Sequence, residues 1–122
     1  MIQMRAEQQA AFSAEAQHGF DLRAAAFLRD EFPDKWGTTP DPELAAFVRE
    51  SQRRAKPFGL TTEQAVVSVA CIRCFVGDDW SAEPWDWIPK MLGDVKYDPN
   101  FRAKMAAQLA DELSRPQPPK GG

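Results

Sequence analysis

The stretch that decides the fold is Thr61-Thr-Glu-Gln-Ala-Val-Val-Ser-Val-Ala-Cys-Ile-Arg-Cys-Phe-Val-Gly77. Thr61 and Gln64 form a capping box, in which each side chain bonds to a backbone N–H near the other residue, so the stretch begins as a helix. Beyond its first turn only Arg73 is charged, and a helix that is apolar nearly all round is typical of the centre of a bundle. Its β-branched residues would also suit a strand. The capping box, the length and the lack of a partner strand favour a helix over about 62–76 that ends at Gly77.

Helical patterns precede this central stretch. The first, over about residues 6–32, is rich in good helix formers and repeats apolar residues every three or four positions, namely Phe12, Ala16, Phe20, Ala24 and Phe27. Pro33 ends this helix, and residues 33–40 read as a loop. A second helix is expected over about 42–57, between the N-cap Asp41 and the stop at Gly59, with Leu44, Phe47 and Val48 facing inward.

Two further helices complete the chain. A short one is expected over about 84–92, with Gly93 as its stop, and Asp98-Pro99 begins a last helix over about 99–114. The last helix repeats Phe101, Met105, Leu109 and Leu113 at fourfold spacing. We therefore predict an all-α fold for residues 1–114, a single compact bundle of about five helices with connections short enough for antiparallel neighbours. Residues 115–122, rich in Pro and Gly, are expected to form a disordered tail.

Composition and charge restrict the class of protein. The 122 residues suit one domain with its own core. The net charge of −3 argues against a nucleic-acid-binding domain, although it leaves room for a local basic patch. No apolar run is long enough to span a membrane, and the N-terminus lacks the basic and apolar regions of a signal peptide, so a cytoplasmic location is expected. Two cysteines in one segment fit a reducing compartment.

Catalytic and metal-binding groups are few. Cys71 and Cys74 form a CxxC near the end of an apolar helix, whereas a redox CxxC lies at a helix N-terminus, where the thiol pKa is lowered. Zinc requires four ligands, and His18 is the only histidine. No hydrolase, phosphate-loop or zincin motif occurs. We predict no catalytic residue, no cofactor and no metal site, and we interpret both cysteines as core residues, with a redox or metal role as the alternative.

Tryptophan and acidic residues crowd the segment between Gly77 and Gly93. Trp85 shares a helical face with Ile88 and Leu92 and is expected in the core. Trp80 and Trp87 point elsewhere in that register, so at least one of them is expected to be partly exposed. Exposed tryptophan beside acids is typical of an interface anchor with a polar rim. The partner-binding residues predicted here are Trp80 and Trp87 with Asp78, Asp79 and Asp86, and Trp36 in the loop after the first helix is a further candidate anchor.

A basic cluster, Arg49, Arg53, Arg54 and Lys56, lies on the second predicted helix. Residues 49–56 carry four bases and one acid, net +3, whereas residues 78–98 carry six acids and two lysines, net −4. These segments could pair within the fold or present two surfaces of opposite charge. We predict Arg49, Arg53 and Arg54 as a second partner-binding surface. The same helix resembles a DNA-recognition helix, so a small DNA-binding regulator is the alternative function.

The order of these motifs resembles a family of small helical bacterial proteins encoded in type VI secretion loci, near the spike and PAAR-type genes and their effectors. The resemblance covers about residues 10–113. It lies in Phe32-Pro33, Ala55-Lys-Pro-Phe-Gly-Leu-Thr-Thr-Glu63, Phe75-Val-Gly-Asp-Asp79 and Glu83-Pro-Trp85. It implies a non-enzymatic, protein-binding accessory protein: an adaptor or chaperone for a secreted effector, or the effector's immunity protein. The implied partner is an effector toxin or a component of the secretion spike.

Overall fold

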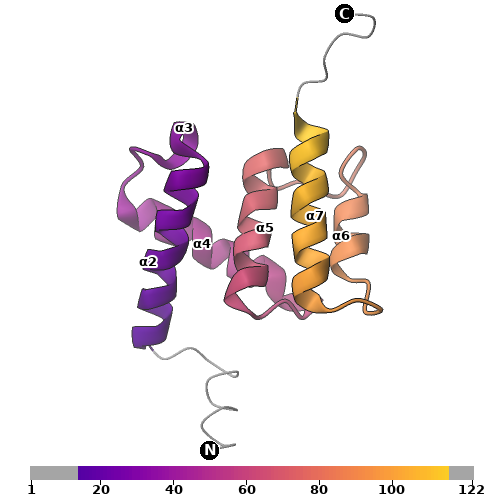
Figure 1. Ribbon diagram of the computed structural model, residues 1–122, viewed down its shortest axis with the longest axis horizontal. Helices are drawn as coiled ribbons and strands as arrows, with labels where there is room; N and C mark the ends of the chain where they lie inside the picture. The colour runs from indigo at the N-terminus through magenta and orange to yellow at the C-terminus, as the bar shows by residue number, and fades with distance from the viewer. Residues whose placement is uncertain (1–13, 116–122) are drawn as a thin grey trace, which may run out of the picture.

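The computed structural model describes residues 14–115, and all regular structure within that range is helical (Figure 1). The elements are α2 (Ala14–Glu31), α3 (Pro33–Trp36), α4 (Asp41–Ala55), the 3-10 helix η1 (Lys56–Phe58), α5 (Glu63–Val76), α6 (Trp87–Leu92) and α7 (Pro99–Ser114). The predicted all-α fold is thereby confirmed. The predicted start of the first helix and most of the predicted C-terminal tail lie outside the described residues.

The central position predicted for the apolar helix is confirmed by α5, which packs against α7, α4 and α2. Its buried apolar residues are Ala65, Val66, Val69, Ala70 and Ile72. The helix is capped by Thr62, whose Oγ1 accepts a hydrogen bond from the backbone N–H of Ala65 at 3.1 Å. The cap therefore lies one residue after the predicted Thr61 box. The helix ends at Gly77, whose φ of +85° lies in a region that favours glycine.

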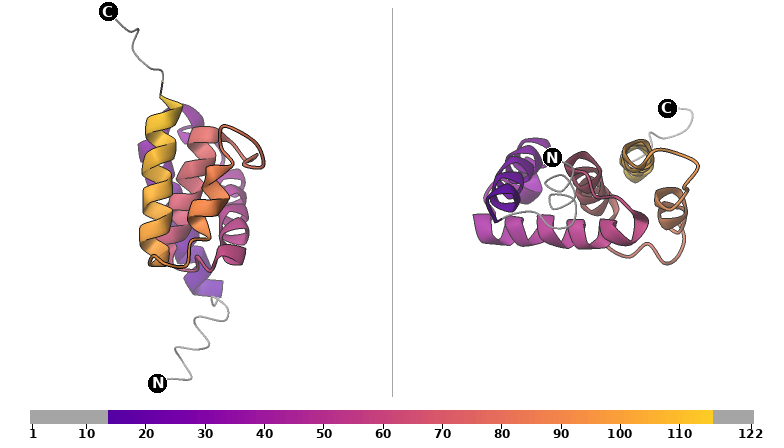
Figure 2. Two further views of the ribbon diagram at one scale, coloured as in Figure 1. Left: turned by 90° about the vertical axis from the view of Figure 1, so that its right-hand side faces the viewer. Right: turned by 90° about the horizontal axis from the view of Figure 1, so that it is seen from below.

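The helices α2, α5 and α7 run in the same direction, and α4 crosses behind α2 and α5 (Figure 1 and Figure 2). The rings of Phe32 and Phe75, at the ends of α2 and α5, have centroids 5.1 Å apart. Thr62 and Asn100, at the starts of α5 and α7, are joined by a hydrogen bond. We predicted antiparallel neighbours from the short connections; the consecutive helices α6 and α7 are antiparallel, whereas α5 and α7 pack in parallel (Figure 1). The reason is that residues 77–98, which include α6, return the chain to the end at which α5 began.

The face that α7 turns to the core differs from the prediction. Phe101 and Leu113, expected inside, are 49% and 56% exposed, and Met105 and Leu109 are half-buried. The buried apolar residues are Ala103, Ala106 and Ala110, which recur at i, i+3 and i+7. Small side chains let two helix backbones approach closely, so α7 packs on α5 through alanine and leaves its larger residues outside.

The other differences concern helix ends. Residues 33–36 form the short helix α3 instead of a loop, because proline suits the first position of a helix. The helix predicted from residue 84 begins at Trp87, although Gly93 follows its end as predicted. Asp41 does not cap α4; Pro40 takes the N-cap position, and the Asp41 carboxylate pairs with Arg29 at 2.6 Å.

Within residues 14–115, no helix by itself has the length and apolar character needed to cross a membrane. One bent pair, Asp41–Phe58 with Glu63–Val76, meets the criteria jointly, by length and composition alone.

Candidate functional site

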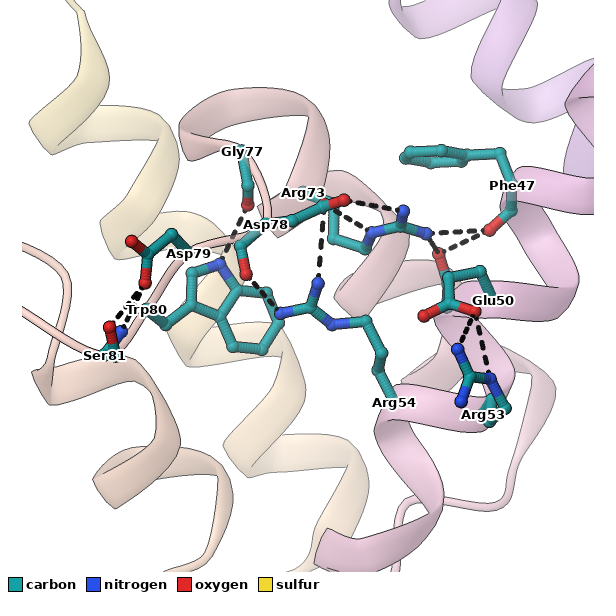
Figure 3. A network of polar contacts seen from close by, with 11 residues as sticks. Phe47, Glu50, Arg53, Arg54, Arg73, Gly77, Asp78, Asp79, Trp80 and Ser81 are labelled. Carbon is teal, nitrogen blue, oxygen red and sulfur yellow. Dashed lines mark hydrogen bonds and ion pairs between the residues drawn. The ribbon is translucent and has the colours of Figure 1, made fainter.

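The start of the tryptophan segment is held against α4 and α5 by a buried arginine (Figure 3). Arg73 donates from Nε and Nη2 to the two carboxylate oxygens of Asp78, at 2.7 and 3.1 Å. Its Nη1 donates to the carbonyl of Phe47 at 2.9 Å and to the hydroxyl of Ser51 at 2.8 Å. The guanidinium also lies 4.0 Å from the centroid of the Phe47 ring. Arg73, only 6% exposed, therefore joins α5, α4 and the loop after Gly77.

A second arginine, Arg54 of α4, covers Trp80 in the same loop. Its guanidinium lies 4.3 Å from the centroid of the Trp80 ring and donates to the carbonyl of Asp78 at 2.6 Å. Trp80 donates from Nε1 to the carbonyl of Gly77 at 2.9 Å and is only 7% exposed. At least one of Trp80 and Trp87 was expected to be partly exposed; that residue is Trp87, because Trp80 is buried. Trp80 belongs to the buried core, and Trp85, predicted there, is half-buried against it.

We name Arg54, Arg73, Asp78 and Trp80 the loop clamp. Hydrogen bonds from Arg73 hold the pKa of Asp78 below its usual range, so this carboxylate is ionised at neutral pH. Burial lowers the pKa of Arg54, although an arginine keeps its charge in proteins. The clamp thus joins three charged groups to the Trp80 ring and fixes the loop. Three of the predicted interface residues, Arg54, Asp78 and Trp80, serve the fold in this way.

The remaining residues of the predicted tryptophan surface are Asp79, Asp86 and Trp87. Asp79 is exposed and accepts hydrogen bonds from the backbone N–H and the hydroxyl of Ser81 at 3.0 and 2.6 Å, which lower its pKa. Asp86 precedes α6 and makes no capping bond with its side chain. Trp87 is half-buried against the core. For Asp79, Asp86 and Trp87 a role in partner binding remains a prediction.

Trp36 is engaged inside the molecule. Its ring centroid lies 4.6 Å from that of Phe47, and its Nε1 donates to Cys74 Sγ at 3.2 Å. It is half-buried and packs against the core, so most of the predicted anchor surface is covered.

The basic cluster on α4 is paired with carboxylates. Arg49 donates to the buried carboxylate of Asp21 on α2, with Nη2 3.0 Å from Oδ2. Arg53 pairs with Glu50 one turn earlier on the same helix. Arg54 contacts Asp78 in the loop clamp, so the acidic and basic segments of the sequence do pair within the fold at this point. The three predicted arginines therefore do not form one unpaired basic surface.

The two cysteines are half-buried and free of a disulfide. Burial raises the pKa of Cys71 to about 12 and also raises that of Cys74, so both thiols are protonated at neutral pH. No cluster of three or more metal-ligating side chains exists between residues 14 and 115. The two cysteines therefore do not supply a reactive thiolate, and the described residues do not supply a set of metal ligands.

An open groove lies over α5 between α2 and α7. We name it the α5 groove; its volume is about 550 Å³. Its apolar lining consists of Phe20, Ala24 and Phe27 from α2, Val67 and Cys71 from α5, and Ala107 from α7. Phe20 and Ala24 are buried, whereas Phe27 is exposed. An apolar concavity of this volume is within the range of protein binding sites.

Charged and polar side chains form the rim of the α5 groove. Arg23 of α2 reaches across to Glu63 of α5, with both Glu63 carboxylate oxygens within 2.9 Å of Nη2. Lys104 of α7 lies on the opposite side, is exposed, and has no ion pair with any residue between 14 and 115. The rim therefore carries two cations: Lys104, which has no ion pair among residues 14–115, and Arg23, which is paired with the carboxylate of Glu63.

Sequence reasoning missed the α5 groove because it requires three helices that are distant in the chain. It assigned Phe20, Ala24 and Phe27 to one apolar face but did not predict which helices would leave part of that face open. Arg73 was visible in the sequence as the one charge in an apolar helix, and such a residue must find partners when buried. That signal could have revealed the loop clamp.

Comparison with known proteins gives no match: no protein family, no curated protein and no solved structure corresponds to this chain. The surfaces of the molecule itself are therefore the basis for inferring its function.

Proposed function

We propose that this chain is a non-catalytic protein-binding accessory protein, and that the α5 groove is its main binding surface. The observation that carries the proposal is an open apolar groove with a charged rim, whereas Trp36, Trp80 and the α4 arginines are engaged within the fold. Contiguous exposed apolar surface with a polar rim is typical of protein interaction sites. Trp36 and Trp80, the candidate anchors in the sequence, contribute to the core instead.

The paired state of the α4 arginines supports a protein partner over DNA. A helix that binds phosphates uses Lys and Arg side chains that are free to contact them. Arg49, Arg53 and Arg54 would each have to leave a carboxylate before doing so. The net charge of −3 adds a general repulsion toward nucleic acid.

The biological setting we propose is a bacterial secretion locus of the type VI kind, in the cytoplasm. The support is the order of motifs in the sequence, from Phe32-Pro33 to Glu83-Pro-Trp85. The partner in this setting is a secreted effector or a spike component. The chain acts there as an adaptor or chaperone during loading, or as an immunity protein that blocks the toxin.

Reciprocal co-purification tests this function. The tagged full chain is expressed with each protein encoded beside it, and each candidate is then purified and mixed with it at micromolar concentration. We expect one neighbour to form a complex of defined stoichiometry in size-exclusion chromatography. If none of the neighbours binds, and the chain instead binds duplex DNA with a steep dependence on salt, the protein-binding function is wrong. Arg53→Ala with Arg54→Ala identifies that DNA mode, since it would abolish such binding.

A further inference from the structure

We propose that the α5 groove receives a single amphipathic helix from the partner, with a stripe of large aliphatic side chains flanked by acidic residues. The inference rests on the proposed protein-binding function and specifies the partner of the same site. Three features of the groove carry it: its shape, the small size of its lining residues, and the charge of its rim.

The shape of the groove is that of a missing helix in a bundle. α5 forms its floor, and α2 and α7 form its two sides, all three running in parallel (Figure 1 and Figure 2). Phe20 and Phe27 are seven residues apart on α2, which corresponds to about 10 Å of helix, or two turns. A guest helix presents side chains at i, i+3 or i+4, and i+7 over the same length. The groove therefore matches two turns of one helix.

Four of the lining residues of the groove have small side chains. Ser68 and Cys71 lie on the floor, Ala24 lies on the α2 side, and Ala107 lies on the α7 side. Small residues leave room for large ones from the opposite helix, because interhelical packing fills space by complementary sizes. The guest stripe is therefore expected to consist of Leu, Ile or Phe.

The positive charges on the rim of the α5 groove favour a partner helix with acidic residues beside its apolar stripe. Lys104 on one side has no ion pair among the described residues, and Arg23 on the other side is exposed beyond its contact with Glu63. A helix lying between them places its flanking positions near the start of α5 beside both cations. Glu31 and Asp111, whose charges act on Cys71, lie one turn beyond Phe27 and Ala107, so the acidic positions of the guest belong at the Lys104 end. Carboxylates at those positions gain attraction, whereas lysines are repelled, so charge sets the choice of partner.

The walls of the groove are fixed before a partner arrives. Glu63 and Arg23 join the floor to the α2 side near the start of α5, and the rings of Phe32 and Phe75 join the same two helices at the far end. The hydrogen bond between Thr62 and Asn100 joins the floor to the α7 side. Trp36 adds a hydrogen bond to Cys74 at the same end. A preformed site loses less conformational entropy on binding, which favours docking without rearrangement.

The experiment uses two synthetic helical peptides of about 18 residues, long enough for five turns. Both carry the same leucine stripe, and the flanking positions are glutamate in one and lysine in the other. Fluorescence anisotropy measures their binding to the full chain at low salt. We expect the glutamate peptide to bind at least about tenfold more tightly, with the difference shrinking as salt screens the charges.

Two groove variants and one matched control locate the binding. Val67→Glu places a carboxylate on the floor, and we expect about a tenfold loss of affinity for the glutamate peptide. Lys104→Glu changes an exposed rim residue, which leaves folding intact, and we expect it to reduce the preference for glutamate or reverse it. Phe101→Glu is an equally large change on the outer face of α7, and we expect affinity within about twofold of wild type.

Three results would overturn the inference: no binding of either peptide, equal binding of both, or affinities unchanged by Val67→Glu and Lys104→Glu. A dimer that Val67→Glu converts to a monomer would also overturn it, since a second copy would then fill the groove. A natural partner that co-purifies with wild type and equally with both variants removes the helix-docking inference and the α5 groove as the binding surface, while the protein-binding function itself stands. Failure of every neighbouring protein to bind removes the proposed function itself.

Discussion

Asp78→Ala is the sharpest perturbation of the loop clamp. It removes the two charge-assisted hydrogen bonds from Arg73, at 2.7 and 3.1 Å, and leaves a guanidinium that is 6% exposed without its counter-ion. Each such bond contributes roughly 1.5–3 kcal/mol. Asp78 is 58% exposed, so solvent screening reduces this contribution, and the Phe47 carbonyl and Ser51 hydroxyl still accept from Arg73. We expect the free energy of unfolding to fall by about 2 kcal/mol.

Urea denaturation followed by tryptophan fluorescence measures this change. The midpoint should fall while the slope stays constant, because the surface exposed on unfolding is unchanged. Asp79→Ala is the matched control: Asp79 is the neighbouring residue and bonds only to Ser81, so we expect a loss under about 0.5 kcal/mol. Equal losses for Asp78→Ala and Asp79→Ala would refute the clamp.

The pH dependence of Asp78→Asn provides an independent test of the same contact. Arg73 lowers the pKa of Asp78 in the folded state, so the ion pair stabilises the fold above the unfolded value, about 3.9. As the pH falls from about 3.9 to below the pKa of Asp78 in the folded state, the carboxylate is protonated and this contribution to stability is lost. We expect the stability difference between wild type and Asp78→Asn to be constant near neutrality and to vanish in acid. A difference that persists at the lowest pH of folding would show that the charge is not its cause.

Three further predictions concern the backbone, the packing of α7 and the thiols. Gly77→Ala should lower the free energy of unfolding by about 1 kcal/mol or more beyond the effect of Gly59→Ala. An added Cβ meets no atom at either position, so the difference comes from the backbone. Gly77 has φ of +85° and ψ of −165°, a conformation that is almost confined to glycine, whereas Gly59 has the milder αL values of φ 75° and ψ 17°. Ala106→Leu should lower the free energy of unfolding, measured by thermal unfolding, by about 1–3 kcal/mol, because Ala106 is fully buried. Phe101→Ala should change it by less than about 0.5 kcal/mol. A larger effect at Phe101 than at Ala106 would show that α7 turns its other face to the core. Cys71 should react slowly with iodoacetamide at neutral pH, because burial raises its pKa to about 12; labelling at the rate of a free cysteine would contradict its placement.

The fold was largely predictable because its helices carry local signals. The apolar run of α5, the stop at Gly77 and the start at Asp98-Pro99 each depend on neighbouring residues, so each could be recognised without the tertiary structure. The inward face of α7 could not. Phe101 and Ala106 lie on different faces, and only contact with α5 decides that the small residues are buried.

The candidate site was predictable only in part, for the same reason. Trp80 and Arg54 were predicted as partner-binding residues, and their contact with each other inside the fold depends on the path of the loop after Gly77. The α5 groove arises where three helices do not meet completely. No single segment contains that information, although Phe27 and Val67 both belong to recognisable apolar patterns.

Protection of Cys71 tests the central claim most directly, because its side chain lines the α5 groove. In the Cys74→Ala variant, Cys71 is the only thiol in the chain, and its alkylation rate is measured at mildly alkaline pH with and without the bound partner. A helix over α5 covers the thiol, so we expect the rate to fall by at least about tenfold at saturation, in proportion to the bound fraction. An unchanged rate at saturating partner would show that the partner binds elsewhere and would contradict the account.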